Sequence, residues 1–313
     1  MTTKLVPPAL EPQAILAKSK LYISRALAAK ARQDMGEYQL WASLALEFLG
    51  KSALAQIHPC LVADPQSFVS LFAAAGVNIG SDVKTIPAKT VFERLTHVSK
   101  RFDNRTQDFC DNMSLKRNAE LHSGEAAFEA AIPASWEGRF WHTADIILEI
   151  TEQRIEHWLG ADHAEAPKEL LAEYTYALSE AAKVRVDTAR DAFRRLPMKE
   201  RDARKGRADQ LAIWEVRRGF RLLEDGIWPV ICPACGSRSF VAGVKYAEEV
   251  SDQDDGYSEE ETVDIMLSAS EFHCPSCDLQ LDSRDEIEAV GLVTDWTETE
   301  TRQREYEPDY GND

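Results

Sequence analysis

Two Cys-x-x-Cys pairs, some forty residues apart, constrain this chain more than any other feature of its sequence. They are Cys232 with Cys235 and Cys274 with Cys277. Each pair lets two thiolates of one tight turn face the same ion, and two pairs complete a tetrahedral shell of four sulfurs. The sequence therefore predicts a structural Zn²⁺ site with these four cysteines as ligands. His273 directly precedes Cys274, but four cysteines already fill such a site.

The composition fits a globular protein of two modest domains. The chain has 313 residues, of which 44% are hydrophobic, and this is ample for packed cores. Four of its six cysteines are in the metal-type pairs, so we expect a reducing compartment and no disulfides, with Cys60 and Cys110 as buried apolar residues. The first residues lack a signal-peptide pattern, and no apolar run approaches a membrane span. We expect a cytoplasmic protein that does not contact a membrane.

The charge of the chain is strongly acidic and unevenly distributed. The formal net charge of −17 argues against a general nucleic-acid coat protein, because phosphate binding depends on Lys and Arg. Residues 183–221 nevertheless hold thirteen basic and six acidic residues, whereas residues 248–264 hold nine acidic residues and no basic one. The basic segment, with Phe193, Trp214 and Phe220, is compatible with RNA binding or with a solvated, salt-bridged helix face. The acidic segment could mimic nucleic acid or mask the basic one, and the sequence leaves both possibilities open.

The hydrophobic pattern predicts a mainly α protein with a small β-rich module near its C-terminus. We expect four parts: a helical bundle over residues 12–162, a basic helical linker over 163–226, a zinc ribbon over 227–296 and a loose acidic tail over 297–313. Helices are expected at 14–35, 37–57, 67–75, 88–109, 113–122, 141–159, 169–193 and 199–224, with Pro167 marking a boundary. Short strands are expected at 240–246, 262–267 and 288–293.

The bundle contains a motif that could carry chemistry. Arg117 and Asn118 precede His122 in an Arg-polar-x-x-x-His pattern, and residues 45–54 contain Leu-Glu-x-x-x-Lys-x-x-Leu with Glu47 and Lys51. Both patterns resemble the HEPN family of small all-α domains, over about residues 14–160. The resemblance implies a dimer in which two Arg-x4-His motifs meet and cut RNA without a metal. It also implies a toxin or an effector of prokaryotic antiphage defence, in which Glu47 approaches the motif.

The motif residues suit that reaction. Histidine titrates near neutral pH, so His122 can take the proton of a 2′-hydroxyl or give one to the leaving 5′-oxygen. Arg117 would hold the scissile phosphate, and Asn118 would orient the imidazole or the phosphate. The expected products are a 2′,3′-cyclic phosphate and a 5′-hydroxyl.

Other interpretations of the same residues stay open at this point. Arg117 could instead pair with Glu120 or Glu125 on the helix surface, and Glu47 with Lys51 could be an ordinary i,i+4 pair. The chain would then be a non-catalytic adaptor that binds nucleic acid or protein, or a zinc-ribbon transcription regulator. The acidic surroundings of the ribbon favour a protein partner, such as an antitoxin, a sensor or a phage trigger.

Overall fold

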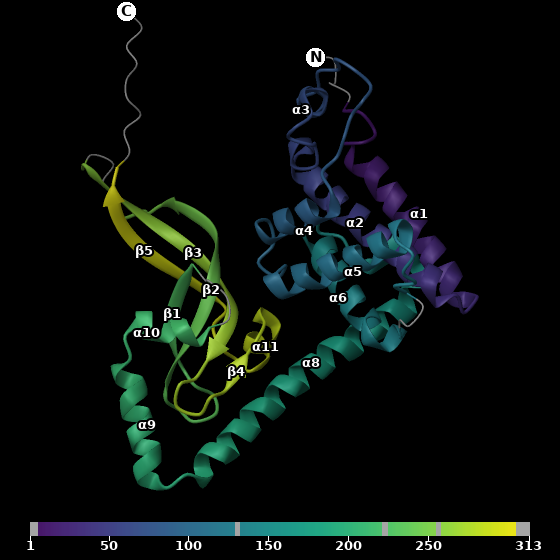
Figure 1. The fold of residues 1–313 in the computed structure, drawn as a ribbon. Helices are drawn as coiled ribbons and strands as arrows, with labels where there is room; N and C mark the ends of the chain where they lie inside the picture. Colours follow the sequence, from purple (N-terminus) through teal and green to yellow (C-terminus); the bar gives the residue numbers. More distant parts are fainter. Residues whose placement is uncertain (1–5, 129–131, 221–224, 255–257, 305–313) are drawn as a thin grey trace, which may run out of the picture. The chain divides into compact units, whose positions relative to one another are not determined.

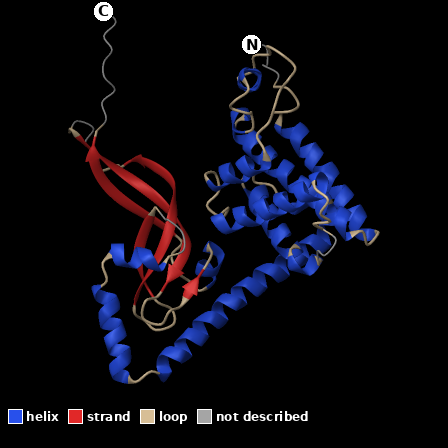
Figure 2. Ribbon diagram, in the orientation of Figure 1, coloured by secondary structure: helices blue, strands red, loops and turns tan. Residues whose placement is uncertain are grey.

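The computed structural model describes residues 6–128, 132–220, 225–254 and 258–304. The chain divides into two compact units, Met1–Ala177 and Leu178–Asp313. The first unit is helical, and the second combines helices with an antiparallel sheet (Figure 1). Figure 2 shows that the strands are confined to the C-terminal part of the chain, so the prediction of a mainly α fold with a C-terminal β module is confirmed.

The described residues of the first unit form α-helices and two short 3₁₀ helices. These are α1 (Pro12–Ala31), α2 (Met35–Ile57), η1 (Pro59–Leu61), α3 (Phe68–Ala74), α4 (Ala88–Thr96), α5 (Asn104–His122), η2 (Pro133–Ser135), α6 (Glu137–Glu149), α7 (Ile155–Leu159) and the first part of α8 (Ala161–Arg195). None of the described helices combines the length and apolar character needed to cross a bilayer.

Helices α1 and α2 pack closely against each other in this unit. The hydroxyl of Ser19 on α1 donates to the carbonyl of Ala45 on α2 at 2.7 Å, and accepts from the indole Nε1 of Trp158 at 3.0 Å. Gly50 of α2 allows α4 to approach closely, since a Cβ at this position would lie 2.8 Å from Cγ1 of Val91. Buried polar bonds and a close helix contact therefore position α2 within the core.

Two of the predicted helices are interrupted in the structure. The expected helix at 88–109 ends at Thr96, and α5 begins again at Asn104 because the Asp103 carboxylate accepts from the Thr106 backbone N–H at 2.8 Å. The motif segment 113–122 is thus the end of a long helix and not a brief one. The expected helix at 141–159 breaks between α6 and α7, where Glu152 has a φ of 54°.

The predicted boundary at Pro167 is also wrong as a helix end. Pro167 lies inside α8, which loses one backbone hydrogen bond there and continues. The two units meet in sequence within this helix, between Ala177 and Leu178.

The second unit is built around a five-stranded antiparallel sheet. After α8 come α9 (Met198–Gln210), α10 (Ile213–Val216), η3 (Arg217–Gly219), β1 (Gly226–Ile231), β2 (Arg238–Val250), β3 (Glu260–His273), β4 (Gln280–Leu281), α11 (Arg284–Ala289) and β5 (Asp295–Gln303). The strand order is β1-β2-β3-β4. The edge of β3 that faces away from β2 pairs with β5 over residues 260–268 and with β4 at residues 272–273. At a register shift in β2, a Cβ on Gly243 would lie 2.4 Å from the Ser268 carbonyl oxygen, so the close approach requires glycine.

Three predictions for this unit need correction. The expected helix at 199–224 ends at Gln210, and its residues 221–224 lie outside the described part of the chain. The expected strand at 288–293 is not formed: its first two residues end α11, whose first turn is capped by the Ser283 hydroxyl, and residues 290–293 are a turn and a loop. The tail expected to be loose from residue 297 forms β5 as far as Gln303, while residues 305–313 lie outside the description.

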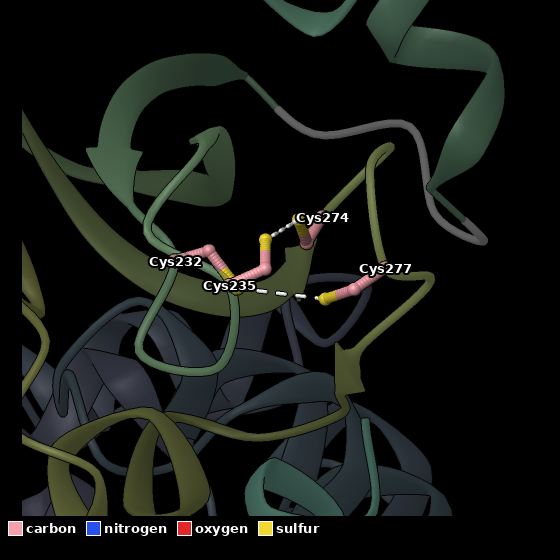
Figure 3. A group of neighbouring side chains, drawn as sticks. All are labelled: Cys232, Cys235, Cys274 and Cys277. Atoms are coloured by element: carbon pink, nitrogen blue, oxygen red, sulfur yellow. Dashed lines mark hydrogen bonds between the residues drawn. The ribbon is translucent and has the colours of Figure 1, made fainter. Parts of the chain in front are cut away.

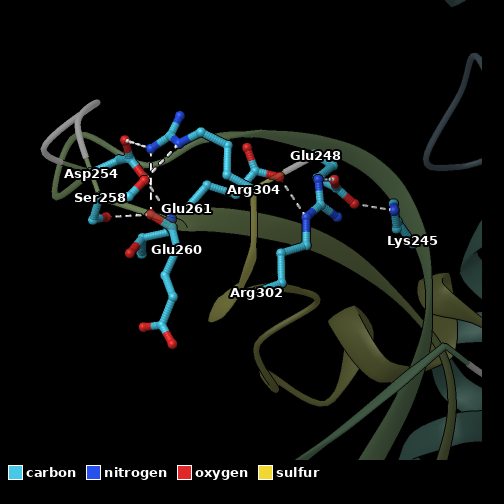
Figure 4. A network of polar contacts seen from close by, with 9 residues as sticks. Lys245, Glu248, Asp254, Ser258, Glu260, Glu261, Arg302 and Arg304 are labelled. Carbon is cyan, nitrogen blue, oxygen red and sulfur yellow. Dashed lines mark hydrogen bonds and ion pairs between the residues drawn. The ribbon is translucent and has the colours of Figure 1, made fainter. Parts of the chain in front are cut away.

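Strand β5 and the residue after it pair with the acidic segment through two arginines (Figure 4). Arg302 binds Glu248 at 2.7 Å and Glu261 at 2.8 Å. Arg304 binds the Asp254 carboxylate at 2.7 Å and donates to the Ser258 carbonyl at 3.2 Å. Part of the acidic segment is therefore neutralised from within its own sheet.

Candidate functional site

The four predicted metal-binding cysteines occupy two turns of the same construction. Cys232 and Cys235 follow β1, and Cys274 and Cys277 follow β3. In each turn the first cysteine's carbonyl accepts from the backbone N–H four residues on, at 3.0 Å in the first turn and 2.8 Å in the second. The N–H of that cysteine donates to the carbonyl five residues on, at 2.9 Å in both. The two pairs are thus equivalent knuckles that present their sulfurs in the same way.

Each knuckle closes with a residue in the left-handed region. Gly236 has a φ of 69°, and Asp278 has a φ of 61° at the matching position. Glycine after a Cys-x-x-Cys pair is an obvious signal for such a turn. Asp278 was not singled out from the sequence, although aspartate tolerates this conformation better than most residues.

The turns bring the four sulfurs together (Figure 3). Cys232 and Cys277 have their Sγ atoms 3.6 Å apart, as do Cys235 and Cys274, and all four lie within 4.8 Å of one another. A tetrahedral centre with metal–sulfur bonds of about 2.3 Å has sulfur–sulfur edges of about 3.8 Å. This cysteine cluster can therefore hold one metal ion with a closed shell of four sulfurs, as predicted.

The protonation of the cluster is coupled to metal binding. Hydrogen bonding with Cys232 raises the pKa values of Cys274 and Cys277 far above the usual range of a thiol and lowers that of Cys235 far below it. Four thiolates at this spacing repel one another unless a cation balances them, so a bound ion would displace the remaining protons.

The residues near the knuckles are only partly as predicted. His273 stays outside the cluster, as expected, and its Nε2 lies 3.2 Å from the Asp278 carboxylate. Cys110 is buried, but the prediction of a buried Cys60 is wrong, because Cys60 is exposed in the 3₁₀ turn that follows α2.

In the first unit, the residues of the two HEPN-like patterns meet at a contact between α2 and α5. Glu47 and Arg117, seventy positions apart, form an ion pair between the Glu47 Oε2 and the Arg117 Nη1. The other oxygen of Glu47 lies 2.8 Å from the ammonium of Lys51, which also donates to the Thr85 hydroxyl at 3.2 Å. All three charged residues are at most 8% exposed.

Glu47 is held in its charged form by this arrangement. Burial raises its pKa, but the opposite charges of Lys51 and Arg117 outweigh burial, so the pKa lies below the usual carboxyl range. A buried carboxylate with two cations is a strongly constrained group. Glu47 approaches the motif, as the resemblance implied, and Arg117 does not use Glu120 or Glu125 as its partner.

Arg117 also organises its neighbour. Its Nε and Nη2 both donate to the side-chain oxygen of Asn118, at 3.2 and 3.0 Å. These bonds and the Glu47 pair engage three of the five guanidinium N–H groups. The other two N–H groups have no hydrogen-bond partner among the described residues, and Arg117 is only 8% exposed.

Asn118 and His122 lie on the exposed side of the same helix. Both are exposed, one turn apart, and His122 is the last residue of α5. An open hollow of about 790 Å³ adjoins the end of α5, lined by Arg32, Gln33, Asp34, Met35, Gly36, Glu120 and Ala126. The His122 imidazole is thus presented to solvent at the C-terminal end of α5.

The basic segment provides less aromatic surface than its sequence allowed. Phe193 and Phe220 are buried, and only Trp214, at 64% exposed, is open to a stacking partner. Arg185 pairs with Asp282 at 3.2 Å, and Arg190 donates to the Pro233 carbonyl of the first knuckle at 3.0 Å. These members of the segment stabilise the second unit, in keeping with the salt-bridged interpretation; Arg221 lies outside the described residues.

Comparison of the chain with protein-family models, with curated proteins and with solved structures gave no match in any of the three. The cysteine cluster and the α2–α5 contact are therefore the two features of the molecule that bear on its function.

Proposed function

We propose that this protein is a metal-independent endoribonuclease of the HEPN type, acting as a toxin or an effector of antiphage defence in the cytoplasm of a prokaryote. The observation that carries the proposal is the Glu47–Arg117 ion pair. It joins the two sequence patterns that resemble the family, although they are seventy residues apart and lie on different helices. This contact supports the proposal because the resemblance implies that Glu47 approaches the motif.

In the proposed reaction His122 exchanges protons with the 2′-hydroxyl or the 5′-oxygen of the scissile nucleotide. Arg117, held by Glu47, offers its two remaining N–H groups and its charge to the phosphate. Asn118, whose side-chain oxygen accepts from Arg117, would offer its amide N–H₂ to the same phosphate. A homodimer would supply two such sets to one cleft.

We further propose that the cysteine cluster holds a structural Zn²⁺ in a zinc ribbon. A closed shell of four thiolates suits this ion and gives it no open position for substrate. The ribbon would serve the enzyme as a contact for a protein partner such as an antitoxin, a sensor or a phage trigger.

The test is cleavage of end-labelled tRNA and total RNA by purified protein without added divalent metal. The sharpest variant is His122→Ala, because this side chain is exposed and its loss leaves the core intact. His97→Ala is the matched control, since His97 is also an exposed histidine at the end of a helix. We expect the wild type and His97→Ala to cut RNA and leave cyclic-phosphate ends. We expect His122→Ala to lose at least 100-fold in cleavage rate.

The opposite results are equally clear. Equal cutting by all three proteins would mean that the motif is not the active site. No cutting by a folded wild-type dimer on any RNA would favour the second candidate, a non-catalytic adaptor. The burial of Arg117 favours that candidate, because a side chain engaged in the core can serve structure alone. An adaptor for nucleic acid would bind RNA in a salt-sensitive way that His122→Ala leaves unchanged.

A further inference from the structure

Helix α1 is a basic element in an acidic protein. It contains Lys18, Lys20, Arg25 and Lys30 and no acidic residue over its 20 positions, whereas the whole chain has a formal charge of −17. Lys30 is bound to Glu137. Lys18 and Arg25 have no carboxylate partner among the described residues, and both are exposed.

Three aromatic rings lie beside these two cations. Tyr22 of α1 has its ring centroid 5.5 Å from that of Trp41 and 5.4 Å from that of Phe48, both on α2. All three rings are half-buried, so each packs against the core and also reaches the surface. Trp41 and Phe48 are two helical turns apart, which places the rings along about 10 Å of the α1–α2 surface.

The cations are held over the rings. The Lys18 Nζ lies 4.5 Å from the Phe48 centroid, and the Arg25 Cζ lies 4.8 Å from the Trp41 centroid. Aromatic rings interleaved with unpaired basic groups are what a single nucleic-acid strand needs, since bases stack and phosphates pair with the cations. The aromatic–basic face consists of Lys18, Tyr22, Arg25, Trp41 and Phe48.

This face is connected to the proposed catalytic residues through one side chain. The ammonium of Lys51 lies 5.2 Å from the Phe48 centroid and 2.8 Å from the Glu47 carboxylate. Glu47 in turn binds Arg117. Lys51 thus contacts both the aromatic–basic face and the Glu47–Arg117 pair from within the core.

We propose that the aromatic–basic face binds the single-stranded RNA substrate of the proposed endoribonuclease. The inference deepens the proposed endoribonuclease function and rests on it. Duplex RNA fits poorly, because its bases are already stacked within the helix. A second copy of the chain fits poorly as well, since a twofold contact through this face would bring Lys18 and Arg25 close to the same cations.

The test measures binding of fluorescein-labelled single-stranded RNA 12-mers to the His122→Ala protein, so that the RNA stays intact. Into this background we would introduce Lys18→Glu, Arg25→Glu or Trp41→Leu. The control is Lys20→Glu, which changes the charge of the same helix equally but lies about 200° around it from Lys18. Thermal unfolding of each variant would verify folding, and Trp41→Leu keeps an apolar side chain against the core.

Each of the three face variants is expected to bind about tenfold more weakly, and Lys20→Glu within about twofold of its parent. For the two charge variants, the slope of log affinity against log salt should fall by about 0.7 per lost phosphate contact. Duplex RNA of the same sequence should bind more weakly than the single strand.

Three outcomes would overturn the proposal. In the first, Lys18→Glu and Lys20→Glu weaken RNA binding equally. In the second, duplex RNA binds as tightly as the single strand. In the third, the face variants change the oligomeric state of the protein but not its RNA affinity. The last would identify a second copy as the occupant. Cleavage of RNA is measured separately in chains that keep His122. The RNA-binding proposal for the face can therefore be wrong while the endoribonuclease proposal is right, or the other way round.

Discussion

The cysteine cluster and the α2–α5 contact both gather side chains that are distant in the sequence, but different forces hold them. In the cluster, each half is made by one turn with its own backbone hydrogen bonds, and an ion would join the halves. At the α2–α5 contact, Glu47 meets Arg117 only because whole helices pack. The first depends on a ligand and the second on the hydrophobic core, so different perturbations should disable each one.

Removal of one sulfur ligand should have the largest effect. In metal-loaded protein, Cys274→Ser is expected to lose the ion and unfold the second unit, because structural Zn²⁺ contributes on the order of 10 kcal/mol to the folding of small modules. Metal analysis and limited proteolysis would measure this, and a chelator should act in the same way. Cys60→Ser, at an exposed cysteine, is the control. Retention of stoichiometric metal by Cys274→Ser would contradict a four-sulfur site.

Truncation of the buried carboxylate should rank second and affect the first unit alone. Glu47→Ala leaves Lys51 and Arg117 buried without their counter-charge, and should lower the free energy of unfolding by about 3–5 kcal/mol. Glu37→Ala removes an exposed carboxylate of the same helix α2, which pairs with Arg32 at the end of α1, and should cost at most about 1 kcal/mol. Chemical denaturation compares the two. Equal effects would show that the α2–α5 contact contributes nothing beyond a surface pair.

A smaller effect is expected from filling the space between α2 and α4. Gly50→Ala would place a Cβ 2.8 Å from Cγ1 of Val91 and cost about 1–3 kcal/mol of overpacking, partly offset by the higher helix propensity of alanine. Val91→Ala in the same chain should recover part of the loss. A double-mutant cycle with no coupling energy would contradict the close approach.

The pH dependence of stability should show the smallest effect, again through Glu47. Because the folded-state pKa of Glu47 is depressed, its stabilising contribution is present above the ordinary carboxyl range and is lost as the pH falls through the folded value. The free energy of unfolding should therefore fall more steeply below about pH 5 in the wild type than in Glu47→Gln. If the free energy of unfolding depended on pH in the same way in both proteins, Glu47 would not be charged in the folded state.

The sequence was informative where geometry is local and less so where packing decides. Spacing alone located the four metal ligands, because a Cys-x-x-Cys turn leaves little freedom. The break before α5 was missed, since partly buried Val98 and buried Phe102 continue the apolar pattern through it. Only Asp103, as a cap, marks the restart of the helix. The Glu47–Arg117 pair has no local signal, and only the family resemblance pointed to it.

Strand β5 illustrates a different limit. All nine of its residues are exposed, so it has no hydrophobic face by which a sequence pattern could reveal it. It is a strand because the edge of β3 offers unpaired backbone groups, in register from Glu260 with Gln303 to Ser268 with Asp295. Tertiary context overrides a composition that is typical of loose chain.

That strand has a protective consequence. A long β3 edge left open would be a template for pairing between molecules, and β5 covers it with a ribbon of alternating threonine and charge. Among the described strands β5 pairs with β3 alone, so its own outer edge faces solvent and carries Glu298 and Glu300. Such charges repel a second identical edge, and β5 thus protects the sheet against edge-to-edge aggregation.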